Sequence, residues 1–150
     1  MKFKLLTISI VIGCLAASNA NGQIHWQYSS QKMSGNVFKI HITAIIESGW
    51  HLYSQVQPPE AIATPPLVKF SENPAVAFHG KVKEIGQREL YENKEVGIKS
   101  YRYKSAVDFV QVVQIKDEAA TKINGSISYM ACTDEQCMPT RTQQFSIPLK

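Results

Sequence analysis

Hydrophobic and polar residues alternate along much of the chain with a period of two rather than 3.6. In the segment NVFKIHITAII, residues 36–46, Lys39, His41 and Thr43 fall on one face of an extended chain, and the apolar residues fall on the other. The apolar face consists of Phe38, Ile40, Ile42, Ala44 and Ile46. Further segments rich in Val, Ile, Phe and Tyr are residues 24–30, 50–55, 67–70, 75–85, 106–115, 122–132 and 142–149. Short strands of this kind, separated by turn residues, predict an all-β sandwich.

The segments between these strands contain no strong helical pattern. Residues 88–96 (RELYENKEV) have only a weak apolar stripe, enough for a turn or two of helix. Residues 57–66 (QPPEAIATPP) are expected to form a loop, because proline fixes φ and removes a ladder donor. We find no internal repeat, so the sequence predicts one domain.

The N-terminus is typical of an export signal. Lys2 and Lys4 precede an apolar run that is too short to span a bilayer, and small and polar residues follow it. We therefore expect a signal peptide over residues 1–22 and a mature domain over residues 23–150, outside the cytoplasm. An alternative is that VIGC, ending at Cys14, is a lipobox that would anchor the protein through a lipid.

Charge and hydropathy narrow the class of partner. The chain has 16 basic and 12 acidic residues, and loss of Lys2 and Lys4 with the signal would reduce the excess. Such a small excess of positive charge, with no cluster of basic residues, argues against nucleic acid as a partner. No further apolar run approaches membrane length, so we expect no transmembrane segment in the mature chain.

Apart from Cys14, the chain has two cysteines, Cys132 and Cys137, in the stretch YMACTDEQCMP. They flank a four-residue loop where one predicted strand ends, so the two residues can face each other across a hairpin-like end. Cross-strand Cα separations fall in the disulfide range, and such a bond persists outside the cytoplasm. A disulfide is therefore feasible, and its purpose remains open among three alternatives.

The first alternative is a structural bond, and the second is a metal site. Closing so short a loop stabilises a fold by roughly 2 kcal/mol in the chain-entropy model, which is little for a domain of this size. Met130 and Met138 flank the pair and could complete a soft copper site. Their positions relative to the cysteines place them on different faces, which favours core packing as the role of both methionines over metal binding.

The third alternative is thiol–disulfide exchange with another protein. A small disulfide in an exposed turn is the labile kind. Asp134 and Glu135 lie between the cysteines and oppose thiolate formation, which predicts slow reaction until a partner docks. Arg141 is a candidate to offset their charge.

The cysteine stretch resembles the end of the N-terminal periplasmic domain of DsbD, the thiol:disulfide interchange protein. The shared pattern is a strand, Cys, an acidic residue, a second Cys, Pro, Thr and a closing apolar strand, as in residues 129–149. GWHLYSQ, residues 49–55, also resembles the family's Gly-aromatic-x-Leu-Tyr segment. The loop between the cysteines is shorter than in some members, and CMPT has one Pro where two often stand.

The resemblance implies an immunoglobulin-like β-sandwich with the cysteine pair at a hairpin end. It implies that Cys137 forms the mixed disulfide with a partner and that Cys132 resolves it. His51 and Tyr53 would lie beside the pair, with Asp134 in support. The family's cap loop, whose aromatic residue shields the cysteines, would fall in residues 88–101, with Tyr91 as the candidate. Tyr101 is the competing candidate.

We therefore expect a domain that relays reducing equivalents by thiol–disulfide exchange, with no cofactor and no metal. Its electrons would come from the thioredoxin-like domain of a membrane thiol reductase in trans and go to periplasmic thioredoxin-fold oxidoreductases. Any enzymatic activity would be thiol:disulfide interchange. The alternative is a non-catalytic immunoglobulin-like binding module, in which the disulfide is structural and the surface near Trp50 and Tyr53 docks a partner.

Overall fold

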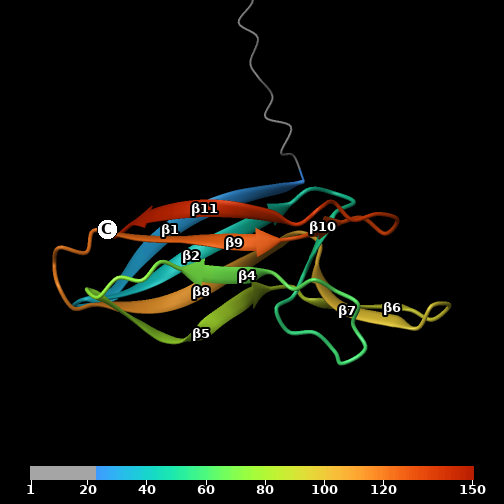
Figure 1. Ribbon diagram of the computed structural model, residues 1–150, viewed down its shortest axis with the longest axis horizontal. Coiled ribbons are helices and arrows are strands. Elements are labelled where there is room, and N and C mark those ends of the chain that lie inside the picture. The colour runs from blue at the N-terminus through green and yellow to red at the C-terminus, as the bar shows by residue number, and fades with distance from the viewer. Residues whose placement is uncertain (1–22) are drawn as a thin grey trace, which may run out of the picture.

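The computed structural model describes residues 23–150, which are built from strands and contain no helix (Figure 1). The expected signal peptide and Cys14 lie outside the described residues. Within residues 23–150 there is no helix that could cross a membrane. The strands are β1 (Ile24–Ser34), β2 (Val37–Ile46), β3 (His51–Tyr53), β4 (Leu67–Phe70), β5 (Val76–Gly86), β6 (Glu89–Asn93), β7 (Ile98–Tyr103), β8 (Ala106–Ile115), β9 (Lys122–Tyr129), β10 (Ala131–Cys132) and β11 (Arg141–Pro148).

Two antiparallel sheets form the layers of a sandwich. One has the strand order β1-β2-β8-β5, and the other has the order β11-β9-β4 and lies over it (Figure 1). Aromatic contacts join the layers, since Trp26 of β1 lies 5.1 Å from Tyr129 of β9 between ring centroids. Tyr28 of β1 likewise lies 5.7 Å from Phe145 of β11. The immunoglobulin-like β-sandwich is confirmed.

The core lies between these layers, and the alternation in β2 explains how it is filled. Ile40, Ile42, Ala44 and Ile46 are all buried, as the pattern predicts. In the same sheet, β8 contributes Val107, Phe109 and Val113, and the facing sheet contributes Ile123, Ile127, Phe145 and Ile147. Burial of this apolar surface is the main source of stability, at about 25 cal/mol per Å².

A third sheet, β10-β3-β7-β6, extends from one end of the sandwich (Figure 1). The same end carries the Pro-rich segment 57–66, which contains no strand, as expected. Residues 88–96, for which the sequence indicated at most a turn or two of helix, contain no helix, and the expected cap region 88–101 consists of strands and their turn. They form most of the β6–β7 hairpin, in which Leu90 pairs with Tyr101 and Tyr91 pairs with Ser100.

Candidate functional site

The third sheet places a row of functional side chains on one face. Cys132 pairs with His51 across β10 and β3, and Tyr53 pairs with Arg102 across β3 and β7. Arg102 in turn pairs with Glu89 of β6. Because directly paired residues share a face, and side chains alternate along each strand, these five side chains lie on the same side of the sheet.

The opposite face of this sheet belongs to the core. Ala131, Leu52 and Tyr103 are paired across β10, β3 and β7, and all three are buried. The sequence HLY, residues 51–53, explains this arrangement, since Leu52 points into the core while its two neighbours point to the functional face. The packing of Leu52 therefore holds His51 and Tyr53 in position.

Cys132 and Cys137 form a disulfide that closes a tight turn. Their Cα atoms are 4.0 Å apart, and the two residues form an antiparallel bridge. Inside the turn, the Thr133 amide donates to the Gln136 carbonyl at 2.7 Å, and Thr133 Oγ1 accepts from the amides of Glu135 and Gln136. The Met138 amide donates to the Ala131 carbonyl at 2.9 Å, which continues the pairing beyond the disulfide.

The two cysteines differ in access to solvent. Cys132 is 0% exposed, whereas Cys137 is exposed and lines a cavity of about 280 Å³. The cavity is bounded by the turn, by β3, and by the β6–β7 hairpin. A large molecule can therefore reach Cys137 from the cavity side, but it cannot reach Cys132.

A buried arginine connects the elements around this cavity. Arg102 is 3% exposed, and its Nε donates to Glu89 Oε1 at 2.6 Å while its Nη1 donates to Asp134 Oδ1 at 2.8 Å. The guanidinium carbon lies 4.0 Å from the centroid of the Tyr91 ring, in a cation–π contact. Lys104 also pairs with Glu89, at 3.1 Å. One guanidinium thus joins the hairpin to the cysteine turn.

The cations of this network lower the pKa of its two carboxylates, Asp134 and Glu89. The hydrogen bond from Arg102 and its charge lower the pKa of Asp134. For Glu89, burial alone would raise the pKa, but the bonds from Arg102 and Lys104 outweigh burial and lower it. Both carboxylates are therefore ionised at neutral pH and paired with cations.

His51 is buried and neutral at physiological pH. Burial first, and then the charge of Arg102, lower the pKa of His51 to about 4. Arg102 Nη1 approaches His51 Nδ1 to 3.4 Å, and a guanidinium can only donate, so Nδ1 is the acceptor and Nε2 carries the proton. The His51 ring also lies edge-on to Tyr53, with centroids 5.3 Å apart. Burial also raises the pKa of Tyr53, which stays a phenol.

The residues expected from the sequence to lie near the cysteines line one cavity. His51, Tyr53, Asp134 and Tyr91 all border the cavity that Cys137 borders. Tyr101, the competing cap residue, lies elsewhere, with the guanidinium of Arg88 4.4 Å above its ring. Arg141 lines a separate cavity with Trp26 and Tyr129, so Arg102 is the cation that pairs with Asp134 here.

Arg102 was not anticipated from the sequence. It stands between two tyrosines in YRY, residues 101–103, where an arginine on the polar face of a strand is usually solvated. The alternation of that triplet was the available signal, since it puts Tyr103 into the core and Arg102 on the opposite face. Pairing with Glu89 and Asp134 is what permits its burial.

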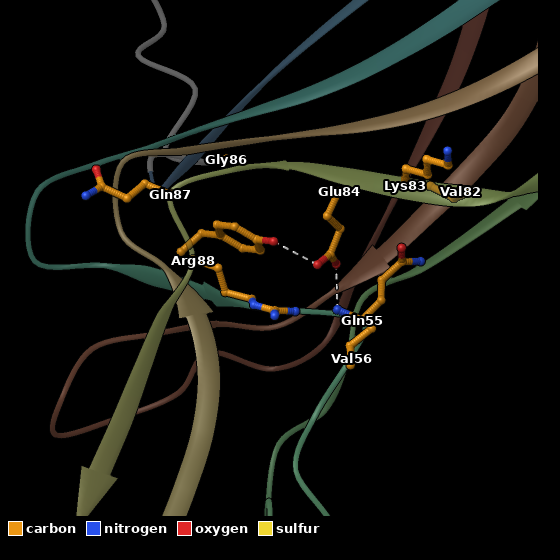
Figure 2. A pocket seen from close by; sticks show the side chains of 9 residues that line it. Gln55, Val56, Val82, Lys83, Glu84, Gly86, Gln87 and Arg88 are labelled. Carbon is orange, nitrogen blue, oxygen red and sulfur yellow. Dashed lines mark hydrogen bonds between the residues drawn. The ribbon is translucent and has the colours of Figure 1, made fainter.

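A larger cavity, of about 760 Å³, lies away from the cysteines (Figure 2). Its centre is Glu84 of β5, which accepts hydrogen bonds from Ser54 Oγ at 2.6 Å, from the Gln55 amide at 2.5 Å and from the Tyr103 hydroxyl at 2.9 Å. Figure 2 shows the bonds to Gln55 and to the tyrosine converging on the Glu84 carboxylate. Ser54 directly follows β3, so Glu84 connects the sandwich to the sheet that carries the cysteines.

Comparison with known proteins identifies the family. The family described as thiol:disulfide interchange protein DsbD, N-terminal, matches residues 19–149. The chain belongs to the DsbD N-terminal family. No curated protein matches it in sequence. The DsbD N-terminal assignment agrees with the β-sandwich and with the disulfide at its hairpin end.

Two solved structures share the fold at low sequence identity, and a third is similar at a lower TM-score. The N-terminal periplasmic domain of ScsB from Proteus mirabilis has a TM-score of 0.60 and 15% identity, over 86% of this chain and 47% of that one. The chain thus spans about half the length of the ScsB domain. The GAE domain of GGA2p from Saccharomyces cerevisiae has a TM-score of 0.51 and 8% identity, over 88% and 96%. The complex of the DsbD and PilB N-terminal domains from Neisseria meningitidis has a TM-score of 0.47 and 10% identity, over 81% and 80%.

Proposed function

We propose that this domain relays reducing equivalents in the periplasm by thiol–disulfide exchange at Cys132 and Cys137. The observation that carries the proposal is the asymmetry of the disulfide, in which Cys137 is exposed and Cys132 is fully buried. Membership of the DsbD N-terminal family supports the same chemistry. The domain needs no cofactor, because the two cysteines hold both electrons.

Reduction of the domain begins at Cys137. A thiolate of the donor attacks Cys137 Sγ, the Cys132–Cys137 bond breaks, and its electron pair stays on Cys132 Sγ, which takes a proton from water. The second thiolate of the donor then attacks the first donor sulfur, which is bonded to Cys137 in the mixed disulfide. Cys137 leaves as a thiolate, and the donor carries the new disulfide.

Oxidation of the domain reverses these steps with a different partner. The Cys137 thiolate attacks the disulfide of an acceptor and forms a mixed disulfide, with release of one acceptor thiolate. Cys132 then gives its proton to water, attacks Cys137 Sγ as a thiolate and releases the second acceptor thiolate. The buried position of Cys132 suits this intramolecular step, because a partner cannot compete for its sulfur.

The partners are thioredoxin-fold proteins on both sides of the relay. The donor is the thioredoxin-like domain of a membrane thiol reductase acting in trans, and the acceptors are periplasmic thioredoxin-fold oxidoreductases. Around Cys137, Tyr91 and Ile62 form apolar parts of the cavity that a partner would contact. His51 and Tyr53 of β3 and Asp134 of the turn line the same cavity and support the pair.

Trapping of mixed disulfides tests this function. The variant Cys132→Ala, produced in the bacterial periplasm, should accumulate mixed disulfides through Cys137, which mass spectrometry should identify as adducts with thioredoxin-fold proteins. The matched variant Cys137→Ala should accumulate none, since Cys132 is buried. Trapping by Cys132 instead would reverse the assigned roles, and an absence of adducts in both variants would refute the relay.

A further inference from the structure

The cysteine turn carries two acidic side chains that should hinder thiolate formation, and one of them is neutralised. Asp134 and Glu135 lie between the cysteines, and both line the cavity of Cys137. Of these two carboxylates, only Asp134 forms an ion pair within the described residues. Its partner is the buried guanidinium of Arg102, at 2.8 Å. Arg102 comes from β7, far from the turn in sequence.

The other charged and titratable groups facing the cavity can be accounted for. On β3, His51 is neutral and Tyr53 is a phenol. On β6, Glu89 is paired with Arg102 and Lys104, and the Tyr91 ring lies against the guanidinium. Arg102 is thus the cation shared by Asp134 and Glu89, and its removal would leave Asp134 without that pairing.

We propose that Arg102 is a positioning residue of the exchange site, which neutralises Asp134 and so keeps the Cys137 thiol reactive. A negative charge near a thiol raises the free energy of its thiolate, so a neutralised Asp134 opposes ionisation less than a free one. Glu89 holds the same guanidinium within the hairpin, and the bond of that guanidinium to Asp134 fixes the turn against the hairpin. This inference rests on the proposed function, since it assigns a purpose to the reactivity of Cys137.

The position of Arg102 favours this role over a purely structural one. An arginine used only to close the hairpin would need Glu89 alone, which lies opposite it in the same ladder. Instead, Nη1 is directed to the exposed Asp134, whose side chain is 66% exposed and would otherwise be solvated. The ion pair with a buried guanidinium therefore couples the charge of the exposed Asp134 carboxylate to the site.

The test measures the ionisation of Cys137 directly. In a Cys132→Ala background, Cys137 is the single cysteine of residues 23–150, and its alkylation by iodoacetamide can be followed from pH 6 to pH 11. Arg102→Met should raise the midpoint of alkylation by about one pH unit. Adding Asp134→Asn to Arg102→Met should return the midpoint to within about 0.3 pH units of the background. A merely structural loss would not be repaired by removing a charge.

Two further variants complete the design. Arg88→Met is the matched control, because Arg88 also stacks on a tyrosine of the hairpin but lines the other cavity (Figure 2); it should leave the midpoint unchanged. Asp134→Asn alone changes an exposed residue and tests the inference even if Arg102→Met fails to fold. It should lower the midpoint, since the charge of Arg102 is then less compensated.

The outcomes separate this inference from the proposed function. An unchanged midpoint in Arg102→Met, a shift that Asp134→Asn does not reverse, or an unchanged midpoint in Asp134→Asn alone would overturn the role of Arg102. Alkylation needs no partner protein, so these results stand whether or not Cys137 traps thioredoxin-fold proteins.

Discussion

His51 lies directly opposite Cys132 in the β3–β10 ladder, and both residues are buried. The pairing brings a titratable ring next to the sulfur that the exchange reaction must release. Because burial and Arg102 hold the pKa of His51 near 4, this ring carries no charge at the pH of the reaction. Cys132, the residue whose sulfur leaves, is therefore paired with a residue that has a neutral imidazole, and the buried positive charge of the site is that of Arg102.

The lowered pKa of His51 predicts a loss of stability in mild acid. The unfolded chain binds a proton at His51 below about pH 6.5, and the folded protein binds it only near pH 4. The unfolded state thus holds more protons in this window, so the free energy of unfolding falls as the pH falls from about 6.5 to 4. The contribution is of the order of 2–3 kcal/mol.

Urea unfolding at pH 7 and pH 4.5 measures this effect. His51→Gln should lose less stability between the two pH values than the wild type does. His25→Gln is the control, because His25 is an exposed residue paired with Glu47 and should retain the wild-type pH dependence. Equal pH dependence of wild type and His51→Gln would show that His51 is not held neutral by the fold.

Glu84 is predicted to be essential for the position of the third sheet. Replacing it with Ala removes the acceptor of Ser54 Oγ and of the Tyr103 hydroxyl, and both residues are buried. Leaving buried hydroxyls without a partner costs about 1–3 kcal/mol each, so the free energy of unfolding should fall by at least this amount. Urea unfolding of Glu84→Ala, with Glu84→Gln as the milder variant, measures the loss. A change below about 0.5 kcal/mol would contradict the role of this connection.

Tyr91 is expected to act through its ring rather than its hydroxyl. The ring faces the guanidinium of Arg102, and a cation–π contact is worth about 0.5–2 kcal/mol. Tyr91→Ala should therefore lower the free energy of unfolding by about 1 kcal/mol, whereas Tyr91→Phe should preserve it. Equal losses in the two variants would indicate that the hydroxyl group, and not the ring face, is what matters.

The strand pattern was largely predictable because the sandwich buries one face of most strands. β2 and β9 alternate so regularly that their core residues follow from the sequence. The β6–β7 hairpin was not predicted as strands, since residues 89–99 are mostly polar and the hairpin extends away from the core. A ribbon of this kind is held by backbone pairing and by contacts such as Arg102 with Glu89, which leave little periodic signal.

The candidate site was predictable in part for a similar reason. Cys132 and Cys137 stand close in sequence at the end of a predicted strand, so a disulfide between them was feasible from the sequence, and the structure contains it. The pairing of Asp134 with Arg102 joins residues 32 positions apart, and it depends on how β10, β3 and β7 stack side by side. No local pattern encodes such a contact, so the sequence offered the nearby Arg141 as the cation for the acidic turn and did not indicate Arg102.

The reduction potential of the Cys132–Cys137 pair tests the central claim most directly. The oxidised protein can be equilibrated with dithiol redox buffers, and the fraction of free thiol can be quantified by alkylation and mass spectrometry. A disulfide that takes part in exchange should have a midpoint above about −300 mV, within reach of thioredoxin-like reductants. A midpoint well below about −300 mV would mark a structural bond and would contradict the proposed relay.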